Sequence, residues 1–140
     1  MKKFLEKSQK IKATCIVKHD DKILLLRGDQ VVNREHRPRA GYFGIPSFTV
    51  PFSKDPEDIA RQSLQDYFSQ TIEDLSIVDV SQYLSENDSE QIFEIVYSAT
   101  CNPGTQLESN TDVFFFSTEE ELDNYMFPEE IKELRKYLDL

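Results

Sequence analysis

The 140-residue chain is poor in the residue types on which several common kinds of functional site depend. It contains two cysteines, two histidines and four glycines. Cys15 and Cys101 lie in strand-like stretches without a Cys-x-x-Cys or Cys/His spacing, so we expect buried thiols in a reducing cytosol rather than a zinc site. His19 and His36 are isolated, no nucleophile is paired with a base, and no glycine-rich phosphate loop is present. Zinc chemistry, nucleophilic catalysis and phosphate binding by a glycine loop are therefore not expected.

The chain is also short of positive charge and of long apolar stretches. It has 16 Lys and Arg against 26 Asp and Glu, a formal net charge of -10, which argues against general nucleic-acid binding and against an anionic membrane partner. No apolar stretch is long enough to span a bilayer, and the opening MKKFLEKSQK lacks the apolar core of a signal peptide. With 39% hydrophobic and 30% charged residues, the composition is that of a globular protein. We therefore expect a cytoplasmic protein with one domain over residues 1–140.

One helix with a clear start signal organises the rest of the sequence. Asp55 is a candidate N-cap, Pro56 suits the first helical position, and Glu57 and Asp58 favour the positive end of the helix dipole. Positions 63, 66 and 67 are spaced so that their side chains could share a ligand. Apolar residues recur every three to four positions and predict one buried face, formed by Ile59, Ala60, Leu64, Phe68 and Ile72.

The remaining segments alternate between strand patterns and turn signals. Residues 1–10 suit a short helix or a frayed tail, and two strands joined by a turn at Asp20-Asp21 predict a hairpin. A capping-box pattern from Ser117 predicts a helix, and Pro128 opens a last helix with an apolar stripe at Ile131, Leu134 and Leu138. Strands are predicted at 12–18, 22–27, 42–45, 75–84, 91–101 and 113–116, with a further strand between Pro46 and the first helix.

The order aromatic-Gly-Ile-Pro, strand, Ser-Lys-Asp-Pro-Glu and helix resembles the Nudix box of the MutT-like pyrophosphohydrolases. That box runs G-x5-E-x7-R-E-U-x-E-E-x-G-U, where U is bulky and aliphatic, and it follows a W-x-L-P-G lead-in. When Gly44-Ile45-Pro46 is aligned with the lead-in, Phe48 takes the position of the first Gly of the box and Lys54 takes the position of its first Glu. In the helical part of the box, Gln62 stands at the position of the Arg, Ser63 at the Glu that follows it and Leu64 at the first U. Asp66 and Tyr67 stand at the Glu pair, and Ser69 stands at the second Gly. The resemblance spans residues 11–138 and implies an α/β fold, a Nudix-like α/β/α sandwich with a mixed β-sheet.

The resemblance also implies a chemistry for which most of the expected groups are missing. Nudix hydrolysis uses divalent cations, usually Mg2+, held by helix carboxylates against a diphosphate. Ser63, Asp66 and Tyr67 offer one carboxylate, and losing a single preorganised group often costs ~10²–10³ in rate. We therefore expect weak or lost hydrolysis, with Asp66 as the remaining metal ligand and Mg2+ as the cofactor if activity persists. The resemblance makes Glu94 a second catalytic candidate, because the corresponding strand faces the metal site in many Nudix enzymes. The alternative interpretation of the helix that begins at Pro56 is that it is simply an amphipathic core helix.

Positive charge is concentrated in the loop at 29–39, which contains Arg34, Arg37 and Arg39. Guanidinium groups match phosphate oxygens, so this loop could hold a phosphate together with Lys54, and Phe48 could stack on a base or ring. The structural alternatives are a solvated loop, a Lys54 that points to solvent and a Phe48 that belongs to the core.

Two classes of function remain open. The favoured hypothesis is a Nudix-fold module that binds a nucleoside-diphosphate-type or other phosphorylated ligand, or a protein partner, with a homodimer also possible. The alternative is a divergent hydrolase of nucleoside diphosphate derivatives that recruits metal ligands from Asp66, Glu94, Glu108 or Asp112. An unrelated α/β domain is the third possibility.

Overall fold

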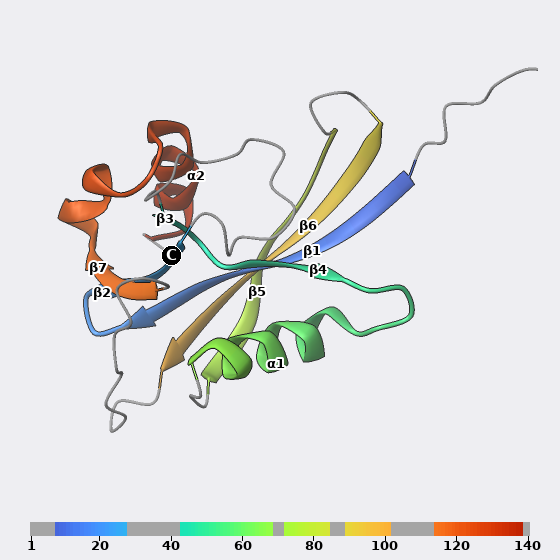
Figure 1. Ribbon diagram of the computed structural model, residues 1–140, viewed down its shortest axis with the longest axis horizontal. Helices are drawn as coiled ribbons and strands as arrows, with labels where there is room; N and C mark the ends of the chain where they lie inside the picture. The colour runs from blue at the N-terminus through green and yellow to red at the C-terminus, as the bar shows by residue number, and fades with distance from the viewer. Residues whose placement is uncertain (1–7, 28–42, 69–71, 85–88, 102–113, 139–140) are drawn as a thin grey trace, which may run out of the picture.

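The structure is a computed structural model that describes residues 8–27, 43–68, 72–84, 89–101 and 114–138 (Figure 1). Seven strands form one mixed sheet, with α1 packed on one face and α2 on the other. This arrangement confirms the predicted α/β/α sandwich. The elements in chain order are β1 (Ser8–His19), β2 (Lys22–Arg27), β3 (Phe43–Gly44), β4 (Ser47–Val50), α1 (Pro56–Phe68), β5 (Ile72–Leu84), β6 (Glu90–Cys101), β7 (Phe114–Thr118), η2 (a 3-10 helix, Glu119–Asn124) and α2 (Pro128–Leu138).

Strand β1 lies at the centre of the sheet and pairs with three other strands. On one side it runs parallel to β6 over eleven residue pairs. On the other side its first half pairs with β4 and its end pairs with β2, both antiparallel. The predicted β1–β2 hairpin is confirmed, and its turn contains Asp20 with a φ of 56°, a left-handed conformation that Asp tolerates better than most residues.

Alternation along β1 divides its side chains between the two faces of the sheet. Ala13, Cys15 and Val17 point towards the core under α1, whereas Ile16 belongs to the core under α2. Cys15 is fully buried, as predicted, and burial raises the pKa of its thiol to about 12. The thiol is therefore protonated at neutral pH.

Helix α1 begins at Pro56 as predicted and packs through Ala60 and Leu64, both 0% exposed. The predicted apolar stripe was too long, because the helix ends at Phe68. Ile72 is buried in the same core but starts β5, where it lies opposite Cys101. Its burial is thus provided by the sheet and not by the helix.

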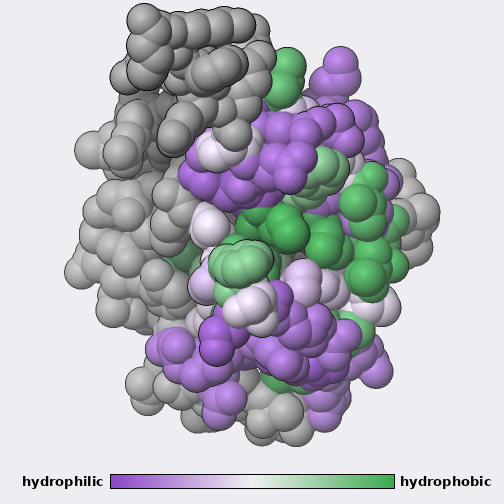
Figure 2. Space-filling view, turned by 90° about the vertical axis from the view of Figure 1, so that its right-hand side faces the viewer, coloured by the Kyte–Doolittle hydropathy of each residue, from purple (hydrophilic) through white to green (hydrophobic). Residues whose placement is uncertain are grey.

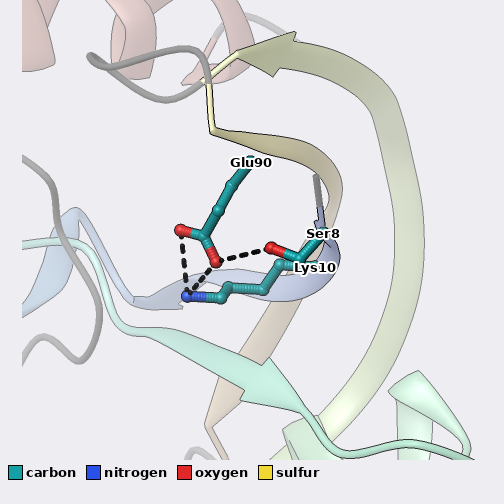
Figure 3. A network of polar contacts seen from close by, with 3 residues as sticks. All are labelled: Ser8, Lys10 and Glu90. Atoms are coloured by element: carbon teal, nitrogen blue, oxygen red, sulfur yellow. Dashed lines mark hydrogen bonds and ion pairs between the residues drawn. The ribbon is translucent and has the colours of Figure 1, made fainter. Parts of the chain in front are cut away.

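The beginning of β1 also differs from the prediction of a helix or frayed tail. Ser8 to Lys10 form strand because they pair with the start of β6, from Ser8 opposite Glu90 to Lys10 opposite Ile92. The Lys10 ammonium lies 3.0 and 3.3 Å from the two Glu90 carboxylate oxygens, and the Ser8 hydroxyl donates to the same carboxylate at 3.4 Å (Figure 3). These contacts join residues 80 or more positions apart, so local sequence could not predict them.

The segment after β7 forms a 3-10 helix and not the predicted capping-box helix. The Thr118 hydroxyl donates to the Glu121 carboxylate at 2.9 Å and makes no capping bond to the backbone. Leu122 is fully buried in this helix. Helix α2 then begins at Pro128 as predicted and buries Ile131 and Leu134.

The contribution of Leu64 to folding can be measured directly. We expect Leu64→Ala to lower the free energy of unfolding by about 2–5 kcal/mol, because it leaves a cavity between α1 and the sheet. Urea unfolding followed by circular dichroism measures this change. The neighbouring exposed residue provides the control, since Gln65→Ala should change stability by less than about 0.5 kcal/mol. Equal effects of the two substitutions would contradict the packing described for α1.

Candidate functional site

A cavity of about 1080 Å³ lies between the sheet and α2. Residues of β1, β4, β5 and β6 line its sheet side, and residues of α2 with Met126 and Phe127 line the other. We call it the α2-side pocket. Its lining contains Glu94, one of the two predicted catalytic residues.

The floor of the α2-side pocket is a chain of polar side chains within the sheet. The Thr14 hydroxyl donates to the Glu94 carboxylate and lies 2.9 Å from the Ser47 hydroxyl. Thr14 has one hydroxyl proton, so Ser47 must donate to Thr14 while Thr14 donates to Glu94. Lys12 stands opposite Glu94 in the β1–β6 register, and the Lys12 side chain is only 5% exposed. Glu94 is therefore held in a fixed orientation as an acceptor.

One wall of the pocket is tied together by a bond between α2 and β5. The Tyr137 hydroxyl donates to one oxygen of the Asp79 carboxylate at 2.7 Å. Burial, this hydrogen bond and the negative charges of Asp79, Glu133 and Glu94 together raise the pKa of Tyr137. The other oxygen of Asp79 accepts the backbone N–H of Val80 at 2.8 Å.

The charges that line the pocket are mainly negative. Its lining contains five carboxylates and two ammonium groups, a formal difference of -3. One ammonium, that of Lys136, is 3.0 Å from the Glu133 carboxylate. A phosphate would be repelled at this lining, whereas a neutral group or a hydrogen-bond donor would be accepted. The carboxylates are Asp79, Glu94, Glu129, Glu130 and Glu133, and the ammonium groups are Lys12 and Lys136.

Helix α1 lies on the opposite face of the sheet from this pocket. Leu64 points into the core, Ser63 is half-buried, and Gln62 and Asp66 are exposed. The two predicted catalytic residues, Asp66 and Glu94, are therefore on opposite sides of the sheet. The structure does not bring them together.

Comparisons with known proteins decide which fold this is. No protein-family model and no curated protein sequence matches the chain. Solved structures do match it. A MutT NUDIX hydrolase from Burkholderia pseudomallei superposes with a TM-score of 0.67 at 16% identity, covering 92% of this chain and 98% of that one. A NUDIX hydrolase from Nitrosomonas europaea gives 0.66 at 9% identity, with 92% and 88% covered. The mutator MutT protein from Bacillus halodurans gives 0.65 at 14% identity, with 90% and 80% covered.

The chain has the Nudix fold. The resemblance found in the sequence is thereby confirmed at the level of the fold, while identities of 9–16% leave ligand and activity to be argued from this chain's own residues. Among the described segments, no helix is long and apolar enough to cross a bilayer.

The Mg2+ associated with Nudix hydrolases does not fit the described part of α1. Mg2+ requires several oxygen ligands in octahedral geometry to replace its water. On the box face of this helix Asp66 is the one carboxylate described, and Ser63 stands where the box has a Glu. Nowhere among the described residues do three His, Cys, Asp or Glu side chains gather in a way that could hold a metal ion.

Of the predicted ligand-binding residues, Phe48 is buried and Lys54 is exposed. Phe48 is 5% exposed and packs in the core under α1, so the core alternative is correct and the predicted stacking on a ligand is not available. Lys54 is exposed in the turn between β4 and α1. Arg34, Arg37 and Arg39 lie outside the described residues, so their role stays a prediction.

Most residues of the α2-side pocket were not predicted from the sequence. Thr14, Ser47, Asp79 and Tyr137 were not identified as site residues, although each contributes a hydrogen bond to the pocket floor or wall. One signal was present: the strand KATCIVK places Lys12 and Thr14 on the same face, two polar residues at strand spacing inside an otherwise apolar strand. Asp79 and Tyr137 are 58 positions apart and gave no local signal.

The Tyr137–Asp79 bond predicts a specific pH dependence. The folded state holds the pKa of Tyr137 above its ordinary value of 10, so the neutral phenol stabilises the fold below pH 10 and this contribution is lost as the pH rises further. We expect Tyr137→Phe to lower the free energy of unfolding by about 1 kcal/mol at pH 8 and to flatten its decline above pH 10. Urea unfolding at several pH values gives both quantities.

A double-mutant cycle with Asp79→Ala, which removes the acceptor, isolates the interaction between the two side chains. If Tyr137→Phe costs the same free energy with and without the Asp79 carboxylate, the bond does not stabilise the fold.

Proposed function

We propose that this protein is a Nudix-fold binding domain for a nucleoside-diphosphate-type or other phosphorylated ligand, with hydrolysis weak or lost. One observation carries the proposal: the sheet separates Asp66 on α1 from Glu94 in the α2-side pocket. Two carboxylates on opposite faces cannot hold one metal ion against a diphosphate. The pocket nevertheless keeps a preorganised polar floor, which suits binding.

The charges suggest how such a ligand is divided between two regions. The net negative lining of the α2-side pocket favours the uncharged part of a ligand, whose donors can bond to the Glu94 carboxylate. The phosphate then requires cations elsewhere, and we assign it to Lys54 with Arg34, Arg37 and Arg39. Fixed cations bind a diphosphate electrostatically but do not generate a metal-bound hydroxide. Such a site binds without cleaving.

The divergent-hydrolase alternative keeps one supporting observation. Glu94 accepts a hydrogen bond from Thr14 in a pocket whose lining also contains Asp79 and Glu133, although these three described carboxylates do not form a metal site by themselves. An active enzyme would have to take its Mg2+ ligands from this pocket, together with Glu108 or Asp112, which lie outside the described residues.

Hydrolysis assays distinguish the two functions. We expect nucleoside triphosphates, dinucleoside polyphosphates, ADP-ribose and nucleotide sugars to turn over barely above background with Mg2+ or Mn2+. The reason is the loss of box carboxylates, since removing a single preorganised electrostatic group often costs ~10²–10³ in rate. Phosphate release measures the activity, with Asp66→Ala and Glu94→Gln as test variants. Robust turnover that either substitution abolishes would establish the enzyme instead.

Binding without metal provides the positive test. In EDTA we expect at least one nucleotide or nucleotide sugar to bind, with an affinity that falls as salt screens the cation–phosphate attraction. Lys54→Glu should weaken this binding by about fivefold or more, because it replaces an attraction by a repulsion. Isothermal titration calorimetry gives the dissociation constants.

The control for Lys54→Glu is Lys132→Glu, which makes the same change of net charge at an exposed position on α2. Equal weakening by the two substitutions would mean that only overall charge matters. Absence of any binding in EDTA would refute the metal-free site.

A further inference from the structure

Strand β5 presents an exposed apolar edge. In the part of the chain that the structure describes, β5 pairs with β6 alone, so its other edge faces away from the sheet. Most of the large apolar side chains that are exposed among the described residues belong to this strand: Ile77 at 59%, Val80 at 60%, Tyr83 at 40% and Leu84 at 58%. Exposed apolar edge strands are templates for association with another chain, unless charges, prolines or bulges block them.

The first half of β5 carries such blocking features. The ladder with β6 is interrupted between Glu73 and Ser76 and again between Ile77 and Asp79. Asp74 has a φ of 55°, outside the strand region. Bulges of this kind twist an edge and end its pairing. This half is therefore unsuited to receive another strand.

The second half of β5 lacks these features. From Asp79 opposite Val96 to Leu84 opposite Gln91, the ladder with β6 is regular. The stretch Val80–Leu84 contains no charged residue and no proline. We call this stretch the open segment of β5.

Backbone groups of the open segment point outwards. The Val80 N–H donates to the Asp79 side chain at 2.8 Å, and this bond is exposed. A side-chain partner at an exposed position places this N–H on the outer edge of the strand. Since N–H and C=O groups alternate in direction along an antiparallel strand, the same groups of Gln82 and Leu84 face outwards as well. These are the groups with which a further strand would pair.

The apolar surface continues from the open segment across the end of the sheet. In the ladder between β5 and β6, Val80 lies beside half-buried Ile95 and Gln82 lies beside Phe93. On β1, Ile11 lies opposite Phe93 and is 40% exposed. Figure 2 faces this end of the molecule, on the right in Figure 1, and shows hydrophobic residues gathered between two hydrophilic bands. The strand edge and the apolar face form one surface.

We propose that a second copy of this chain occupies this edge, by antiparallel pairing of the two open segments about a two-fold axis at Gln82. A strand is complementary to its own copy in this arrangement, because each outward N–H meets an outward C=O. Val80 of one copy then lies opposite Leu84 of the other, both on the α1 face, and Gln82 lies opposite Gln82. No like charges meet within the paired segments, although each copy has a net charge of -10.

The magnitude and salt dependence of this association follow from its size and charge. Five paired residues make an interface smaller than the ~800 Å² per partner of a stable complex, so we expect a weak dimer with a dissociation constant of roughly 100 µM. Repulsion between two acidic copies opposes the dimer and is screened by salt. The affinity of the two copies for each other should therefore increase as the salt concentration rises. The affinity of a basic peptide for the same edge would instead decrease.

Sedimentation equilibrium of the full chain tests the proposal. At protein concentrations up to about 500 µM we expect a monomer–dimer equilibrium that tightens severalfold between about 0.02 and about 0.3 M salt. Val80→Lys and Leu84→Lys should each weaken the dimer by about tenfold or more, because a lysine on an edge blocks pairing. Hydrogen exchange should show protection of the Gln82 and Leu84 amides that increases with protein concentration.

The control is Ile77→Lys, which changes an apolar residue of equal exposure on the same strand but within the bulged half. It should leave the dimer unchanged, and circular dichroism checks that each variant is folded. A monomer at every concentration and salt would overturn the proposal. So would a dimer that Ile77→Lys weakens as much as Val80→Lys, or one that weakens as salt rises.

Discussion

The parallel pairing of β1 with β6 is the interaction on which the rest of this structure depends. Its eleven residue pairs align two strands that are about 80 positions apart in the chain. The register decides which residues share a face, since a slip by one position would turn every side chain to the other side. In the observed register Lys12 stands beside Glu94, and Thr14 can donate to the same carboxylate. The β1–β6 ladder thus brings Lys12, Thr14 and Glu94 together in the floor of the α2-side pocket, and the β1–β4 ladder adds Ser47 opposite Thr14.

The sheet also separates helix α1, which contains Asp66, from the α2-side pocket, which contains Glu94. Helix α1 packs on the sheet through Ala60 and Leu64, with Ile59 beside them, whereas Gln62 and Asp66 are exposed at the helix surface. The fold therefore does not depend on the side chains at these two exposed positions. Glu94 belongs to the opposite face, where it accepts a hydrogen bond from Thr14, which in turn is bonded to Ser47.

Sequence reasoning succeeded where structure is local and failed where it depends on distant pairing. The turn at Asp20, the start of α1 at Pro56 and the stripe of α2 follow from short-range propensities and periodicity, and they were predicted correctly. Ser8 to Lys10 and Ile72 were misassigned because their strand conformation comes from β6. The same reason explains the missed site residues. Thr14 meets Glu94 across 80 positions and Tyr137 meets Asp79 across 58, distances over which a single sequence carries no signal.

Asp79 joins the two surfaces to which functions are assigned. One of its carboxylate oxygens receives the Tyr137 hydroxyl at the wall of the pocket, and the other receives the Val80 N–H at the open edge of β5. A strand that pairs with this edge would therefore compete with the Asp79 carboxylate for the Val80 N–H.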